Sequence, residues 1–337
     1  MNNRNLISKF ELRLRQKLSY KNFIVIFKAL SCCKKITNFI FSNMTEESLS
    51  LKTPTNYYNV FSYQKKLISL ILQGEIFLHH HNLEYIKEMN LLEKIHISNS
   101  TFKSLAFKST IESISYLKNL KELKIFNNNI DRTNFNGNNK KNFSSIFLEN
   151  LKIENFNIGL LLDFSQTDFC PVFLNYIVNS KTIKELKIWI SDNFDNYDIK
   201  LFVKYIKNSK ILLKLHLFMN EECDWDYFFK NLLKNKSILF LDFSGCGLSS
   251  KEAGIINFLT CNQRIKYLNL TDCDLCIDEK FVNSLKANST LNSIIFDGNK
   301  INKKIIPELF KLNIKEISLQ RTNVTNEEID LYKGNNK

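Results

Sequence analysis

Cysteine and histidine side chains are the first candidates for chemistry, because thiolates and imidazoles bind metal ions and act in catalysis. Cys273 and Cys276 form a Cys-x-x-Cys pair, and Cys246 and Cys261 come from the preceding stretch of chain. Four thiols that converge on one point would make a zinc site. A lone pair with this spacing is a weak signal, so we predict no bound metal and no cofactor.

Patterns of catalytic residues are absent from the sequence. It contains no glycine-rich phosphate loop, no zinc-protease histidine pair, no serine nucleophile elbow and no kinase motif set. Three of the five histidines are consecutive (residues 79–81), which leaves few partners for acid–base chemistry. We therefore predict no catalytic residues and no enzymatic activity.

Acidic side chains gather in two segments, residues 191–198 and 220–226. If these are equivalent turns of a repeat, they form an acidic rim that would take a basic partner or a divalent cation, which prefers carboxylate oxygens. The alternative is that Asp198 and Asp224 sit near helix N-termini, where the helix dipole favours acids. The rim residues are Asp192, Asp195, Glu221 and Glu222.

The composition is that of a globular protein. The 337 residues are 44% hydrophobic, with 8 glycines and 3 prolines, which excludes a disordered or collagen-like chain. The longest apolar run near the start, residues 23–27, is too short to span a bilayer, and no signal-peptide pattern accompanies it. Eight cysteines in a chain with ample core favour reduced thiols, and therefore an intracellular location, cytoplasmic or nuclear.

The net charge of +13 is concentrated at one end of the chain. Residues 1–35 hold nine lysines and arginines and one acid, Glu11. A basic end attracts phosphates, so nucleic acid or an anionic membrane is an alternative partner. Lysine and asparagine are frequent throughout the sequence, however, and a general compositional bias explains the same excess.

A repeated strand motif organises the chain. Residues 238–248 (ILFLDFSGCGL) and 265–275 (IKYLNLTDCDL) both fit L-x-x-L-x-L-x-x-N/C/T-x-L. We take the second leucine of this template as an anchor and number the copies by it. Twelve anchors recur about 28 residues apart: Phe10, Phe39, Leu70, Ile95, Leu123, Leu151, Leu186, Leu215, Leu241, Leu268, Ile294 and Ile317.

Helical spacing of apolar residues separates the strand motifs. It is clear in residues 19–31, 197–209, 224–236, 249–263 and 277–289. One short strand and one helix cannot bury their apolar sides alone, but stacked copies can. The sequence thus predicts an α/β solenoid, a horseshoe with a parallel sheet on the concave side and helices on the convex side.

The solenoid is expected to form a single domain over residues 1–337. The repeats cover about residues 7–324, with the first two copies less regular, and residues 325–337 form a partial C-terminal cap. The step of 35 residues from Leu151 to Leu186 predicts an insertion around residues 159–169.

With these motifs the chain resembles the leucine-rich repeat proteins, and its long helical repeats are similar to those of the ribonuclease-inhibitor-like subclass. Members of that subclass include inhibitors of ribonucleases, activators of the Ran GTPase and ligand-sensing arrays of immune receptors. The resemblance implies a protein-binding scaffold without catalytic activity. An enzyme regulator remains the alternative, either a GTPase activator or a substrate-recognition subunit of a ubiquitin ligase, although the long acidic tail of the GTPase activators is missing.

The predicted concave face carries a candidate partner-binding patch. Parallel strands about 4.8 Å apart align equivalent residues of successive copies in columns. Cations and aromatic rings in neighbouring copies would take a partner with an acidic surface, because exposed aromatic side chains beside cations are common interface anchors. Alternatively, Lys–Glu pairs merely solvate the sheet. The patch consists of Lys124, Phe126, Lys152, Lys187, Trp189, His216 and Phe218.

Overall fold

The computed structural model describes residues 8–14, 25–26, 29, 33, 35–43, 65–74, 77–78, 84–126, 129–131, 153–159, 174, 176–190, 196–219, 223–325 and 327–330. The chain divides into two compact units, Met1–Ile183 (unit 1) and Lys184–Lys337 (unit 2). Each unit is described by itself, so the single domain expected from the sequence stays a prediction.

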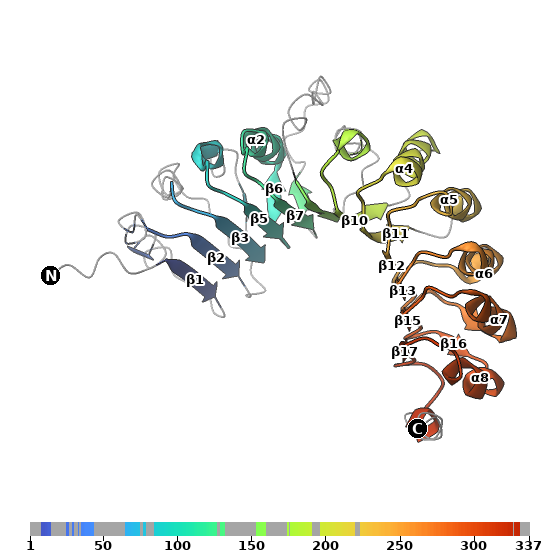
Figure 1. Ribbon diagram of the computed structural model, residues 1–337. Helices are drawn as coiled ribbons and strands as arrows, with labels where there is room; N and C mark the ends of the chain where they lie inside the picture. The colour runs from blue at the N-terminus through green and yellow to red at the C-terminus, as the bar shows by residue number, and fades with distance from the viewer. Residues whose placement is uncertain are drawn as a thin grey trace. The chain divides into compact units, whose positions relative to one another are not determined.

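Unit 1 is built on a parallel sheet whose strands follow one another in chain order (Figure 1). The strands are β1 (Lys9–Leu14), β2 (Asn38–Asn43), β3 (Ser69–Gly74), β5 (Lys94–Ser98), β7 (Glu122–Phe126) and β9 (Asn155–Gly159). The 3₁₀ helix η2 (Glu84–Glu88) and helix α2 (Ser104–Ser115) belong to this unit. A second, short parallel sheet, which the sequence did not predict, contains β4 (Phe77–Leu78), β6 (Thr101–Lys103) and β8 (Asn129–Asp131).

Unit 2 repeats this arrangement with more regular helices, which lie on the same side of its parallel sheet (Figure 1). The strands are β10 (Glu185–Ile190), β11 (Lys214–Met219), β12 (Phe240–Asp242), β13 (Tyr267–Asn269), β15 (Ser293–Ile295) and β17 (Glu316–Ser318). The helices are α4 (Asn196–Asn208), α5 (Trp225–Leu232), η6 (Ser249–Lys251), α6 (Glu252–Cys261), α7 (Glu279–Ala287), η7 (Lys303–Ile305) and α8 (Ile306–Phe310). A two-stranded sheet joins β14 (Cys276–Ile277) to β16 (Lys300–Ile301).

The anchors of the repeat stack in register, which confirms the predicted α/β leucine-rich repeat solenoid. In unit 1 the pairing runs Phe10, Phe39, Leu70, Ile95 and Leu123. In unit 2 it runs Leu186, Leu215, Leu241, Leu268, Ile294 and Ile317. Because side chains alternate along a strand, the anchors face the helices and their neighbours face the other way. We call the face of each sheet that points away from the helices the open face.

The prediction for copy six is wrong by five residues. Leu123 pairs with Phe156, so Phe156 and not Leu151 is the anchor of this copy. Ile153, which is fully buried, fits both registers, as the third apolar template position of the predicted copy and the first of the observed one. The longer spacing therefore falls on both sides of β9, and the insertion does not lie in the step after β9 alone.

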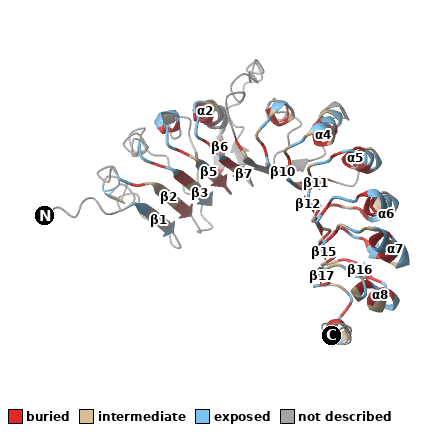
Figure 2. Ribbon diagram, viewed as in Figure 1, coloured by how far each residue is buried: buried red, intermediate tan, exposed pale blue. Residues whose placement is uncertain are grey.

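Burial is concentrated between the strands and the helices of each unit (Figure 2). In unit 2 the indole of Trp225, which is fully buried, stacks on Phe229 at 5.5 Å between ring centroids and meets Phe228 and Phe243 edge-on. Phe258 of α6 continues this cluster through Phe229. The aromatic rings of two successive copies thus join α5 and α6 to the sheet.

In six copies the turn after the template strand uses a left-handed backbone at the same place, four residues after the anchor. The residues there are Gly74, Asn99, Gly245, Asp272, Gly298 and Arg321, with φ between 51° and 99°. At Gly298 a side chain is also excluded by space, since a Cβ atom would lie 1.8 Å from Oδ1 of Asp272. The turn directs the next template residue, the asparagine or cysteine, into the core.

That inward position is filled by hydrogen-bonding side chains. The Nδ2 of Asn299, a residue 3% exposed, donates to the carbonyl of Leu270 at 2.6 Å, and its Oδ1 accepts from the backbone N–H groups of Cys273 and Leu275 at 3.2 and 3.0 Å. Cys273 Sγ donates to the carbonyl of Phe243 at 3.1 Å. Each side chain satisfies buried backbone groups of the copy before it.

A second asparagine position, which the sequence analysis missed, lies where the helices end. Asn235, Asn262 and Asn288 stand three residues before the first template leucine of their copies. The Nδ2 of Asn288 donates to the carbonyls of Leu259 and Asn262 in the previous copy, at 2.8 and 2.6 Å. Its Oδ1 accepts from two backbone N–H groups of its own copy. Asn235 makes the equivalent contacts, so this position links consecutive copies.

The helix boundaries show which side chains act as caps. Asp224 and Asp278 accept from backbone N–H groups at the starts of α5 and α7, as acids near helix N-termini should. The helical residues 327–330 begin with a reciprocal cap between Thr325 and Glu328. No helix in the described part of the chain is long and apolar enough to cross a membrane.

Candidate protein-binding surface

The open face of unit 1 carries a charged cluster around Glu122. This residue, 8% exposed, sits on β7 and pairs through its carboxylate with Lys94 at 3.2 Å, His96 at 2.9 Å and Lys124 at 2.5 Å. Burial raises the pKa of Glu122, but the hydrogen bonds from Lys124 and His96 outweigh it and lower the pKa to about 2. Burial lowers the pKa of His96 despite the opposing effect of Glu122. Lys94 and Lys124 therefore share the single negative charge of Glu122.

We expect Glu122 to make the stability of unit 1 depend on acid pH. Its pKa falls from 4.5 to about 2 on folding, so the ionised carboxylate stabilises the fold above pH 4.5. This contribution is lost as the pH falls from 4.5 toward 2. Urea unfolding across this range should show a steeper loss of stability for the wild type than for Glu122→Gln. Glu93→Gln, which breaks an exposed ion pair with Lys121, should keep the wild-type slope, and equal slopes for all three proteins would contradict the assignment.

The open face of unit 2 brings Lys187, His216 and Asp242 into one column on β10, β11 and β12. The Nδ1 of His216 lies 3.0 Å from Oδ2 of Asp242, and its Nε2 lies 3.5 Å from Glu185. Burial raises the pKa of Asp242, yet the hydrogen bonds from His216 and Ser244 bring it below its ordinary value. His216 is thus held between two carboxylates, whereas Lys187 is half-buried on the neighbouring strand.

An aromatic pair that the sequence analysis missed lies beside this column. The rings of Phe240 and Tyr267 stack at 4.0 Å with an interplanar angle of 4°. His216 packs against Phe240 at 4.9 Å, and Nζ of Lys214 lies 5.8 Å above the same ring. Phe240 and Tyr267 occupy the position just before the anchor, so the template could have placed both on the open face.

The predicted aromatic anchors have different outcomes. Trp189 and Phe126 belong to strands, paired in register with Phe218 and Ser98 respectively, but their side chains lie outside what the structure describes. Phe218 is half-buried, and its ring approaches Gly245 so closely that a Cβ there would lie 3.0 Å from it. The ring of Phe218 therefore packs against the turn of the next copy, at Gly245.

The expected row of lysines is interrupted at copy six. Asn157, not Lys152, pairs with Lys124, because β9 begins at Asn155. Lys152 precedes this strand and lies outside the described residues. The prediction that Lys152 stands in the column of Lys124 is wrong, for the reason given for the anchor of this copy.

The four thiols considered for a zinc site differ in burial. Cys246 and Cys273 are fully buried and donate to backbone carbonyls, whereas Cys261 and Cys276 are exposed. Burial raises the pKa of Cys246 to about 12, which keeps it protonated. Within the described ranges no group of three or more metal-binding side chains occurs. The acidic rim residues Asp192, Asp195, Glu221 and Glu222 fall outside those ranges.

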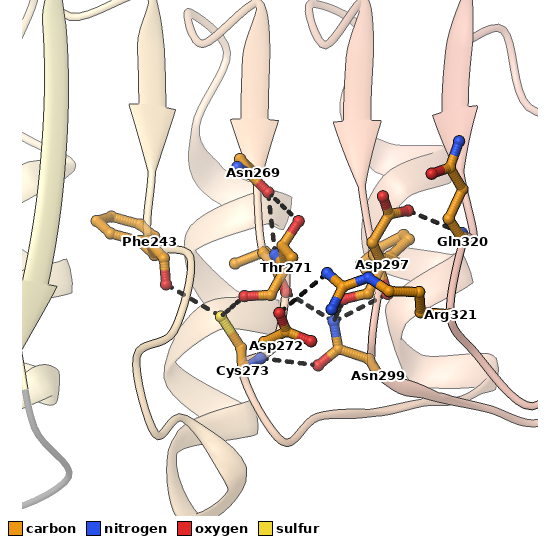
Figure 3. Close-up of polar contacts among 11 residues, drawn as sticks. Phe243, Asn269, Thr271, Asp272, Cys273, Asp297, Asn299, Gln320 and Arg321 are labelled. Atoms are coloured by element: carbon orange, nitrogen blue, oxygen red, sulfur yellow. Dashed lines mark hydrogen bonds and ion pairs between the residues drawn. The ribbon is translucent and has the colours of Figure 1, made fainter. Parts of the chain in front are cut away.

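The turns beyond β13, β15 and β17 carry a polar network that spans three copies (Figure 3). The guanidinium of Arg321 pairs with Asp272 at 3.0 Å, two copies earlier. Asp297, between them, accepts from the backbone N–H of Gln320 at 2.8 Å. This network fixes the margin of the open face in unit 2.

Comparisons with known proteins give a likeness in fold. No protein-family model and no curated protein matches the chain. An internalin from Listeria monocytogenes matches with 13% identity and a TM-score of 0.44, over 80% of this chain and 79% of that one. A chain of the yeast Rad7–Elc1 complex matches with 16% identity and a TM-score of 0.46, over 94% and 81%. These similarities concern the fold alone.

Proposed function

We propose that the chain is a non-catalytic scaffold that binds another protein through the open faces of its sheets and the adjacent loops. The observation that carries this proposal is the set of half-buried polar and aromatic side chains on neighbouring strands of unit 2. Four successive strands contribute one such side chain each: Lys187, His216, Phe240 and Tyr267. The opposite face of these strands packs into the core. A surface spread over several copies suits a large partner better than a small molecule.

The chemistry of this surface favours aromatic anchoring with a charged surround. Stacked rings supply contact area with little loss of side-chain entropy, and they are enriched among residues that dominate binding. We assign the attraction of an acidic partner surface to Lys187, which is half-buried on the open face in the column of His216. Trp189, Phe218 and Phe126 remain proposed binding residues, each two residues further along its strand than Lys187, His216 or Lys124.

The test is to capture a partner from a lysate of the native cell and measure its affinity for purified variants. We expect Lys187→Glu and Tyr267→Ala each to weaken binding by about tenfold or more without unfolding the chain, as truncated interface anchors do. The matched controls are Lys200→Glu, at an exposed position on α4, and Tyr116→Ala, at an exposed position in unit 1. Loss of binding in the controls with full binding in the open-face variants would overturn the proposal.

Two finer assignments belong with this proposal. The full helices α4, α6 and α7 opposite short strands support membership of the ribonuclease-inhibitor-like subclass. The buried thiols of Cys246 and Cys273 suit a reducing compartment, which supports an intracellular location.

A further inference from the structure

The residues that open the strands of unit 2 form a continuous row. The backbone N–H of Leu213 donates to the carbonyl of Lys184 at 2.8 Å, that of Leu239 to Leu213 at 2.9 Å, and that of Lys266 to Leu239 at 2.8 Å. These four residues hold the same template position in successive copies, and each directly precedes β10, β11, β12 or β13. We call them the edge row.

The edge row places two leucines side by side in solvent. Leu213 is 42% exposed and Leu239 is 41% exposed, whereas most other apolar residues of these copies are buried. Strand spacing keeps their side chains close to one another. Lys184 and Lys266 flank the pair, and both are exposed. These four positions therefore place an apolar pair between two lysines.

Further cations surround the edge row. Lys210, Lys236 and Arg264 stand two or three residues before Leu213, Leu239 and Lys266 and are exposed. Arg264 donates to the carbonyl of Lys236 at 3.0 Å, which fixes its guanidinium beside the row. Among the described residues, Lys266 has no acidic partner. The charge of Lys266, in the copy next to Leu239, is therefore available to a carboxylate of a partner.

The equivalent row of unit 1 has a different character. Thr37, Ile68, Glu93, Lys121 and Glu154 are joined by the same backbone hydrogen bonds, at 2.7 to 2.9 Å. There Lys121 pairs with Glu93 at 3.0 Å, and a single exposed aliphatic residue, Ile68, stands among charges of both signs. The repeat therefore does not require two exposed leucines between lysines, and the row of unit 2 needs another explanation.

We propose that the edge row of unit 2 is a docking site for an acidic protein segment that inserts apolar side chains between Leu213 and Leu239. The inference rests on the proposed scaffold function and assigns it a second contact, at the start of the strands. Charge complementarity identifies the occupant: carboxylates on both sides of an apolar residue meet Lys184 and Lys266, while the apolar residue covers the leucines.

The charges of the neighbouring strands favour a protein segment over a polyanion. Glu185 and Glu316 lie on the open face next to the lysine-rich edge. A nucleic acid or an anionic membrane, with charge spread evenly, would meet these carboxylates as well as the lysines. A short protein segment with carboxylates at only two positions can contact Lys184 and Lys266 without approaching Glu185 and Glu316.

The test is selection of random twelve-residue peptides, displayed on phage, against the full chain. We expect the enriched peptides to carry net negative charge and at least one large apolar residue. Synthetic copies should bind the Leu213→Ser, Leu239→Ser double variant about tenfold more weakly than the wild type, and Lys266→Glu should weaken them similarly. The matched control is Ile68→Ser, Leu91→Ser, because both of these unit 1 residues are exposed to a similar degree.

Several outcomes would overturn the inference. One is enrichment of neutral or basic peptides, and another is equal binding by the double variant and the wild type. Binding to phosphatidylserine vesicles or single-stranded DNA that depends on the two leucines would assign the row to a polyanion. Leucine-dependent self-association in sedimentation would assign it to a second copy. If acidic peptides are lost instead with Lys187→Glu, the open-face function stands and only the edge site fails.

Discussion

Replacing Trp225 by alanine is expected to lower the free energy of unfolding of unit 2 by about 3–5 kcal/mol, the range found when large buried aromatic residues are removed from a core. Trp225 is fully buried and touches Phe228, Phe229 and Phe243. Its loss leaves a cavity between α5 and the sheet that the stacked copies above and below cannot close by moving independently.

The measurement for Trp225 is urea unfolding followed by circular dichroism. Trp225→Phe keeps a ring in the cluster and should lose about half as much stability or less. Tyr227→Ala, on the same helix but half-buried, serves as the control for helix propensity. If Trp225→Ala unfolds at the same urea concentration as Tyr227→Ala, the cluster does not hold α5 to the sheet.

Replacing Asn299 by alanine is expected to lower the free energy of unfolding by about 2–4 kcal/mol, because buried backbone groups lose their partners. The groups affected include the N–H groups of Cys273 and Leu275 and the carbonyls of Leu270 and Phe296. Water cannot replace the amide without opening the turn, since Cys273 and Leu275 are themselves buried.

A graded series separates the two halves of this amide. Asn299→Asp keeps an acceptor for the two N–H groups but loses the donor to Leu270, so an intermediate loss is expected. Asn283→Ala, an exposed position on α7, is the control and should change little. Hydrogen exchange of the Cys273 and Leu275 amides should accelerate in Asn299→Ala, and unchanged exchange would contradict the role assigned to the side chain.

Most of the fold could be predicted from the sequence because the buried positions repeat. Leu186, Leu215, Leu241 and Leu268 each follow the same template, and a parallel sheet with short turns leaves them one register. Copy six is an exception, because two registers of its strand fit the template. Leu151 and Phe156 are each the second member of an apolar triplet that includes Ile153, and only tertiary packing chooses between two such registers.

The surface was harder to predict than the core. The template places Lys124 and His216 on the open face, but it does not show that Lys124 pairs with Glu122 on its own strand or that His216 pairs with Asp242 on the next strand. Those pairings depend on side-chain reach along a strand and between copies, which a linear motif does not contain. Phe240 and Tyr267 were not predicted as a pair because they stand just before the anchor, at a template position where no residue type is specified.

The asparagines at the helix ends constrain how such a chain can change in length. The amide of Asn288 serves the carbonyls of the copy before it and the N–H groups of its own copy, and Asn235 does the same. If one whole copy is deleted, the asparagine amide of the following copy meets equivalent carbonyls of the copy that is now its neighbour, so the hydrogen bonds between copies are kept. Deletion of half a copy leaves one donor and one acceptor without a counterpart. Descendants of this protein should therefore gain or lose complete copies.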